Sequence, residues 1–207
     1  MRLVIGGPTL ATVPARFALD LAALYHRTVQ SFLHDGPWMS ATLGFIQSTY
    51  VHVGREAVLA GALERDATHV LWLDTDMTFP AETAIRLARW HRPIVACNCV
   101  MRDPRILFTA ERDNARIETR PDSTGLEAVD SIGLAVLLMR TDVVANLPRP
   151  WFQHGRTDAG VDIGEDRMFC RALRAAGHEI WIDHDLSKEI GHIGQHTFRP
   201  AAAAVSV

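Results

Sequence analysis

The sequence is poor in cysteine and lacks the glycine-rich signatures that usually cradle phosphate groups. Its three cysteines, Cys97, Cys99 and Cys170, cannot all pair, so a secreted disulfide framework is not expected. Neither GxxxxGK(S/T) nor GxGxxG occurs, which removes the usual backbone cradles of nucleotide-binding proteins. A nucleoside diphosphate bound to this chain would therefore need a cation to offset its charge.

The chain also lacks a strong charge imbalance and a long apolar run. A net charge of −3 over 207 residues does not indicate a general affinity for nucleic acid or membrane surfaces. No stretch approaches membrane-spanning length, and the apolar run in Met1–Leu10 is too short for a signal peptide. We therefore expect a cytoplasmic protein with no membrane partner, folded as a single domain over residues 1–207.

Short apolar runs that suit buried strands alternate with helical patterns through the first half of the chain. This alternation predicts an α/β fold, with a mostly parallel central sheet flanked by helices and a small mixed antiparallel part. Strands are expected at 2–7, 41–48, 69–73, 93–100, 133–140 and 178–183; helices at 14–34, 53–63, 80–90, 141–147 and 165–177; and short antiparallel strands or loops at 101–129.

Two carboxylates end the most apolar of these strands, in the stretch HVLWLDTDMTFP. An unpaired carboxylate inside a strand is costly to bury, so the strand should stop at Asp74. Ligands of open α/β sheets bind at the carboxyl ends of the strands, which is where Asp74 and Asp76 fall. Carboxylates separated by one residue suit Mg²⁺ or Mn²⁺, although such pairs also form ordinary turn hydrogen bonds.

A second acidic pair, Glu165 and Asp166 in GEDRMFC, precedes a strongly helical pattern. Acids at this position favour the helix dipole and can cap the helix. The alternative is that one of them faces the cleft as a general base.

Taken together these motifs resemble the GT-A fold glycosyltransferases. The segments LWLDTDMTFP, VDSIGLAVLLMRTDVV, PWF, GEDRMFCRALRAAGHEIWID and HIG stand in the order and spacing of that group. The chain is most similar to short bacterial and phage members of its large inverting family. The resemblance extends from about Val51 to Gly194 and is weaker over the first fifty residues.

The resemblance implies a role for several residues on the donor side. Asp74 and Asp76 are similar to the motif that holds the divalent cation and the nucleotide sugar, with Asp76 the direct ligand. Arg55 matches an arginine placed near the nucleotide, and Thr9 falls where the family contacts the base. Arg102, just past the strand at 93–100, is placed to meet a phosphate or sugar hydroxyl, or to form a surface ion pair.

On the acceptor side the resemblance makes Asp166 the catalytic base, with Glu165 beside it. His192 matches the histidine of the family's HxG motif, which ligates the metal. It follows the last expected strand, and the flanking Gly191 and Gly194 let the backbone approach the site closely. An ordinary hydrogen bond is the alternative, and His184 and His196 are the nearest substitutes as ligand.

The function that follows is a metal-dependent glycosyltransferase, which uses Mn²⁺ or Mg²⁺ and a nucleotide-sugar donor and inverts the anomeric carbon. The acceptor hydroxyl could belong to a glycan, a protein, a small molecule or a hydroxymethylated DNA base. Two alternatives are a sugar-phosphate nucleotidyltransferase and a non-catalytic nucleotide- or glycan-binding module. The first needs a basic residue in the loop after the first strand, where Arg16 comes too late.

Two further expectations concern packing. Cys97 and Cys99 have a metal-site spacing, but without further ligands nearby in sequence they are predicted to be buried core residues. Of Trp151 and Phe152, one is predicted to lie in the core and the other in the cleft as a platform for a sugar ring.

Overall fold

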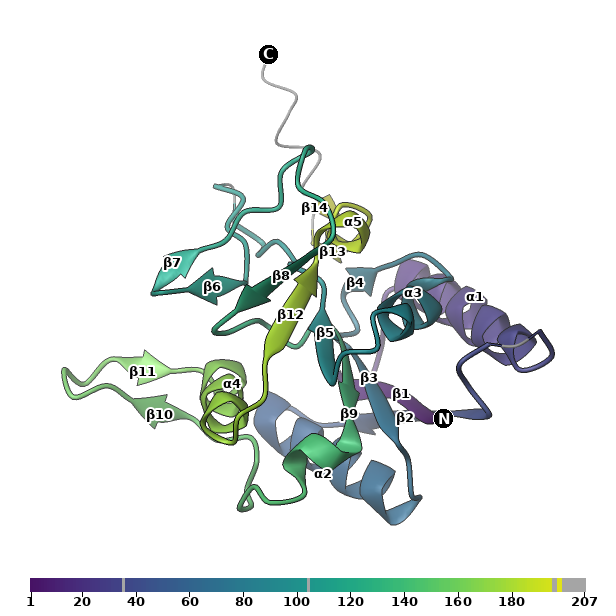
Figure 1. The fold of residues 1–207 in the computed structure, drawn as a ribbon, viewed down its shortest axis with the longest axis horizontal. Helices are drawn as coiled ribbons and strands as arrows, with labels where there is room; N and C mark the ends of the chain where they lie inside the picture. Colours follow the sequence, from purple (N-terminus) through teal and green to yellow (C-terminus); the bar gives the residue numbers. More distant parts are fainter. Residues whose placement is uncertain (35, 104, 195–196, 199–207) are drawn as a thin grey trace.

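The computed structural model describes residues 1–207 except 35, 104, 195–196 and 199–207, and its centre is a seven-stranded sheet with helices on both faces (Figure 1). Across the sheet the strands are, in order, β2 (Ser40–Gln47), β1 (Arg2–Thr9), β3 (His69–Leu73), β9 (Val136–Arg140), β5 (Ile94–Ala96), β12 (Ile180–Asp183) and β8 (Leu126–Val129). β9 and β8 run opposite to the strands beside them, whereas the others run parallel to one another. The predicted α/β class with a mostly parallel, Rossmann-like sheet is confirmed.

Both faces of this sheet are covered, and the alternation of side chains along β3 shows how. Leu71 packs in a core with residues of α1 (Ala15–Ser31) and α3 (Thr83–Arg89). Trp72, on the opposite face, packs with residues of α2 (Val51–Glu64) and α4 (Glu165–Ala175). A strand buried on both faces has no polar side, which is why β3 is continuously apolar from Val70 to Leu73.

Two glycines let β1 lie tightly between its neighbours. A Cβ on Gly6 would stand 2.2 Å from the carbonyl oxygen of Gly44 in β2, and one on Gly7 would stand 2.3 Å from that of Leu73 in β3. Any larger residue would push the strands apart, so Gly7 fixes the position of the end of β3.

Several short elements surround the sheet. They are β4 (Met77–Thr78), β13 (Gly191–Ile193) and β14 (Thr197–Phe198), which form a three-stranded sheet; the hairpins β6 (Glu111–Arg112)–β7 (Ala115–Arg116) and β10 (Gly155–Arg156)–β11 (Asp162–Ile163); and α5 (His184–Ser187). The first hairpin confirms the short antiparallel strands predicted within 101–129. The helix predicted at 141–147 is wrong in length and type, because Thr141–Val144 form a single 3-10 turn.

Within the described part of the chain, no helix is both long enough and apolar enough to span a bilayer.

Candidate active site

The acid pair lies where the sequence predicts, directly after β3 at the carboxyl end of the parallel strands. The backbone N–H of Asp74 donates to the carbonyl of Ala135 beside β9, at 2.9 Å, so the chain is still tied to the sheet there. The N–H of Met77 then donates back to the carbonyl of Asp74 at 3.2 Å, which closes a turn around Thr75 and Asp76. Both acids are partly exposed at this edge.

Arg55 joins the two acidic motifs of the sequence. It extends from α2 with only 4% of its side chain exposed, and its Nη2 donates to Asp74 at 3.1 Å. Its Nη1 donates to Oε1 of Glu165 at 2.5 Å, across 110 residues of sequence. Burial alone would lower the pKa of Arg55, but the charges of Asp74 and Glu165 raise it. The arginine therefore stays charged and holds α4 against the end of β3.

Asp166 follows Glu165 in the first turn of α4 and lies next to this ion-pair group. Its Oδ1 accepts the backbone N–H of Arg167 at 2.7 Å. Burial is the main cause that raises the pKa of Asp166, and the neighbouring negative charge of Glu165 raises it further. A carboxylate that binds its proton more tightly than usual suits a general base, because basicity rises with pKa.

Asp76 contacts a second basic group on the other side of the turn. Oδ2 of Asp76 lies 3.2 Å from Nε2 of His192 and 3.3 Å from Nη2 of Arg102. The contact with the histidine follows from strand pairing, since β13 lies antiparallel to β4 with His192 opposite Met77. The N–H of Ile193 also donates to the carbonyl of Asp76, at 2.6 Å.

The ring of His192 is oriented by the backbone. Its Nδ1 lies 2.8 Å from the carbonyl oxygen of Val100, which can only accept, so Nδ1 carries a proton and Nε2 faces Asp76. Burial lowers the pKa of His192, but the hydrogen bond with Asp76 raises it above its ordinary value. Burial likewise raises the pKa of Asp76, yet the hydrogen bond and charge of His192 bring it below the ordinary value.

Only two of the three metal ligands predicted from the sequence contact one another. Asp76 and His192 converge, whereas Asp74 is engaged by Arg55. Among the residues that the structure describes, no group of three or more His, Cys, Asp or Glu side chains is arranged to hold a metal ion. The ligand role of these three residues remains a prediction.

Thr9 ends β1, the strand adjacent to β3, at the same edge of the sheet. Its hydroxyl donates to the carbonyl of Leu10 at 3.0 Å, and the side chain lines an apolar hollow on the α1 side. Its contact with a nucleotide base stays a prediction.

One of the aromatic expectations is wrong. Phe152 is only 2% exposed and Trp151 is also buried, so neither offers an open ring for a sugar. Phe152 packs against Trp72 and Phe169, which explains its burial. The prediction that Cys97 and Cys99 lie in the core is confirmed.

His184, predicted as a substitute metal ligand, lies away from the acid pair. Its Nε2 is 2.9 Å from Glu127 and its Nδ1 is 2.9 Å from Thr119, so the buried ring is fully engaged there. His196, the other substitute, is outside the described residues. Sequence reasoning also missed His154, whose Nε2 lies 3.9 Å from Oε2 of Glu165. No motif singles this histidine out.

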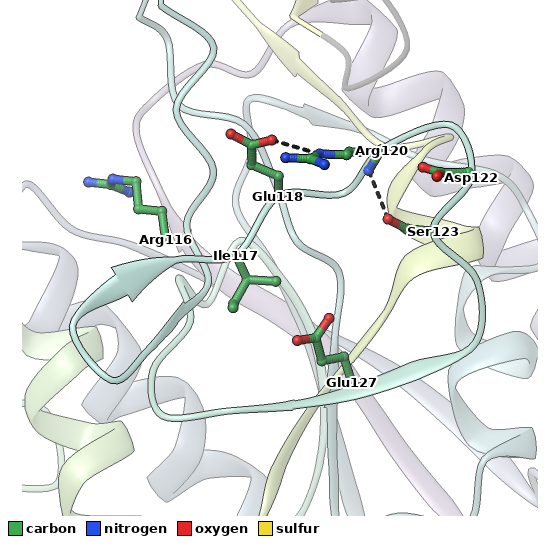
Figure 2. Close-up of a pocket in the computed structure, with 7 residues that line it drawn as sticks. All are labelled: Arg116, Ile117, Glu118, Arg120, Asp122, Ser123 and Glu127. Atoms are coloured by element: carbon green, nitrogen blue, oxygen red, sulfur yellow. Dashed lines mark hydrogen bonds and ion pairs between the residues drawn. The ribbon is translucent and has the colours of Figure 1, made fainter.

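Glu127 also lines a polar hollow of about 450 Å³ near the carboxyl end of β12 (Figure 2). Glu118 and Arg120 point toward one another there and form an ion pair at 3.0 Å. The residues around it are Arg116, Ile117, Glu118, Arg120, Asp122, Ser123 and Glu127. None of the site residues predicted from the sequence belongs to this hollow.

Comparisons with known proteins extend the description of the fold. No family model and no curated protein matches the chain. Among solved structures, A197 from STIV is similar over 97% of this chain and 91% of that chain, with a TM-score of 0.64 and 17% identity. A glycosyltransferase involved in the glycosylation of the major capsid of PBCV-1 is similar over 72% of this chain and 69% of that chain, with a TM-score of 0.33 and 13% identity. The chain thus shares its overall fold with A197, whereas the likeness to the second structure is too low to support an argument.

Proposed function

We propose that this protein is a glycosyltransferase of the GT-A type, which moves a sugar from a nucleotide-sugar donor to an acceptor hydroxyl with inversion. One observation carries the proposal. Arg55 brings the acid pair after β3 and the acidic start of α4 to one point of the sheet edge. A donor-binding acid motif and a base with a raised pKa therefore lie side by side, as a displacement at an anomeric carbon requires.

On the donor side the residues fit a hard divalent cation. Asp76 offers a carboxylate and His192 an imidazole nitrogen, and both groups meet at one point. Because Nδ1 of His192 is held by the carbonyl of Val100, the lone pair of the neutral ring would lie on Nε2, the nitrogen that faces Asp76. A bound Mn²⁺ or Mg²⁺ would stabilise the charge that develops on the departing nucleoside diphosphate. Arg102, which pairs with the same oxygen of Asp76, can donate to the diphosphate when the pair opens.

On the acceptor side Asp166 takes the proton of the attacking hydroxyl. Arg55 and Glu165 hold the start of α4 in place, so that the carboxylate of Asp166 stays at the edge where the donor binds. Base catalysis of this kind is typically worth about 10²–10⁴-fold in rate.

The test replaces the proposed base. Asp166→Asn should lower sugar transfer, or hydrolysis of a nucleotide sugar, by about 10²-fold or more while nucleotide binding stays nearly unchanged. Asp162→Asn is the matched control, since that exposed carboxylate pairs with Arg156 in the adjoining hairpin. A panel of nucleotide sugars with Mn²⁺ would be assayed for turnover, and binding would be measured by calorimetry.

Three results would contradict the proposal. Wild-type rates in Asp166→Asn would remove the base from the mechanism. Tight nucleotide binding without turnover in the wild type would favour a binding module. Formation of a nucleotide sugar from a sugar phosphate and a nucleoside triphosphate would favour a nucleotidyltransferase.

A further inference from the structure

The strand β2 forms one outer edge of the seven-stranded sheet and is paired with β1 on its other side. Just beyond β2, the N–H of Ser48 donates to Thr9, and the carbonyl of Gly44 faces Gly6, so even-numbered residues direct their backbone groups toward β1. Successive residues of a strand direct these groups to opposite sides. The odd-numbered residues from Ala41 to Gln47 therefore direct their N–H and C=O groups to the open edge, where the hydroxyl of Tyr25 reaches the carbonyl of Ala41 at 3.4 Å.

Apart from the Tyr25 hydroxyl at Ala41, the described residues give this edge none of the usual protection against pairing with another strand. Natural edge strands are commonly short, charged, bulged or interrupted by proline. β2 has eight residues, and no charged residue or proline occurs from Trp38 to Tyr50. The opposite edge strand, β8, shows the contrast, because it has four residues and includes Glu127, which pairs with Arg112.

An apolar hollow of about 730 Å³ lies between β2 and α1. Leu43 stands at its wall with 47% of its surface exposed, and Val13 is also partly exposed. None of the twelve residues that line the hollow is charged: Thr9, Leu10, Ala11, Val13, Phe17, Ala18, Leu21, Ala22, Tyr25, Leu43, Phe45 and Gln47. The open backbone edge and the apolar surface thus lie side by side.

We propose that this face joins two copies of the chain, with β2 pairing antiparallel to β2 of the second copy around a two-fold axis. Residues directly opposite each other in such a pair point to the same face of the sheet. The two-fold axis must therefore pass between a residue and the same residue of the second copy. An axis at Leu43 sets Leu43 against its own copy and Ala41 against Phe45. All of these residues direct their backbone groups outward, and their side chains face α1.

The second copy is favoured over other occupants because β2 is uncharged along its whole length. A two-fold axis brings each residue near its own counterpart, so any charge on the strand would meet a like charge. The segment from Trp38 to Tyr50 has none. Pairing would also place the α1 helices of the two copies on one face of a continuous sheet.

Sedimentation equilibrium of the wild-type chain between about 5 and 200 µM tests the proposal. The expected result is a dimer of the 22.9 kDa chain at the upper concentrations. Leu43→Lys should raise the dissociation constant of the dimer by at least about tenfold, since two lysines would meet across the axis. Val161→Lys is the matched control, because Val161 is also open, at 62% exposure, but lies in the β10–β11 hairpin; this variant should remain a dimer.

Amide hydrogen exchange of the wild type gives a second measurement that needs no variant. The N–H groups of Leu43 and Phe45 should gain protection as the concentration rises, while those of Thr42 and Gly44 are protected throughout by β1. A monomer at 200 µM would overturn the proposal. So would a dimer in which Leu43 and Phe45 exchange freely, or dissociation of Val161→Lys to the same extent as Leu43→Lys.

Discussion

Arg55 is the residue on which the candidate site most depends. Its guanidinium is buried between two carboxylates. Among the residues that the structure describes, the next basic group to Glu165 is His154, which is 3.9 Å away and largely exposed. Removal of one member of a buried ion pair leaves the other uncompensated, which costs more than the pair contributes.

Arg55→Met should therefore destabilise the fold by about 2–3 kcal/mol, below the usual 3–5 for fully buried pairs because water reaches Asp74. In a chain of this size the melting temperature should fall by about 5–10 °C. Arg65→Met is the control in the same region, since Arg65 is exposed and donates only to the carbonyl of Gly61, and it should change stability by less than about 0.5 kcal/mol. Calorimetry of both variants measures the difference. Equal melting temperatures for the two variants would show that Arg55 does not stabilise the fold.

The raised pKa of Asp166 predicts a pH dependence of turnover. Burial is its main cause and the charge of Glu165 the next. A base acts only when deprotonated, so the rate should fall as the pH drops through the pKa of Asp166, at a pH above that of an ordinary aspartate. Glu165→Gln removes a like charge and frees Arg55, and both changes lower that pKa. The acid limb of the kcat profile should move to lower pH; an unmoved limb, or one at higher pH, would contradict the assignment.

The sequence singles out these candidate residues, but it does not give all of their partners. Asp74 and Asp76 stand out because they end an apolar strand, and Asp166 because it opens a helix. Nothing local predicts that Arg55 bonds Glu165 across 110 residues, whereas the resemblance already grouped His192 with Asp76 in one predicted metal set. These contacts depend on how α2 and α4 pack on the sheet and on the pairing of β13 with β4.

At the scale of elements, the position of the acid pair depends on the close approach of β1 to β3. Gly7→Ala would place a methyl group 2.3 Å from the carbonyl oxygen of Leu73, the residue before Asp74. Because that atom belongs to the backbone, β3 must shift, and we expect a loss of about 2–3 kcal/mol together with weaker nucleotide binding.

Gly61→Ala is the control for Gly7→Ala and should increase the stability of the fold rather than reduce it. Its Cβ would meet only the flexible end of Arg65, and alanine is favoured over glycine within a helix by about 0.5–1 kcal/mol. Urea unfolding of both variants measures the two effects. If Gly7→Ala were as stable as the wild type, the close packing of β1 would not constrain the site.

Long elements were predictable and short ones were not, for the same physical reason. β3 and α4 carry enough apolar residues at a regular spacing to identify themselves. β4 and β10 have two residues each, so their sequences hold no period, and they exist through pairing with β13 and β11. The strand predicted at 93–100 is regular only over Ile94–Ala96.

At the scale of the whole molecule, the proposed function would require the chain to hold a highly charged donor although its own net charge is −3. The two arginines that the structure places beside the acid pair are already engaged: Arg55 contacts two acids, and Arg102 is paired with Asp76. Donor binding should therefore require a divalent cation, which Asp76 and His192 would hold.

A nucleotide sugar at 100 times its dissociation constant stabilises the fold by about 2.7 kcal/mol, which should raise the melting temperature by about 5–10 °C in the presence of Mn²⁺. The rise should vanish when a chelator replaces the metal.

His192→Ala should weaken metal-dependent nucleotide binding by at least about tenfold, in the range expected for the loss of a group at a metal site. His34→Ala, at an exposed position after α1, should leave it unchanged. A thermal shift that persists in chelator, or an unaltered metal dependence in His192→Ala, would show that the donor is held without the cation or without this histidine.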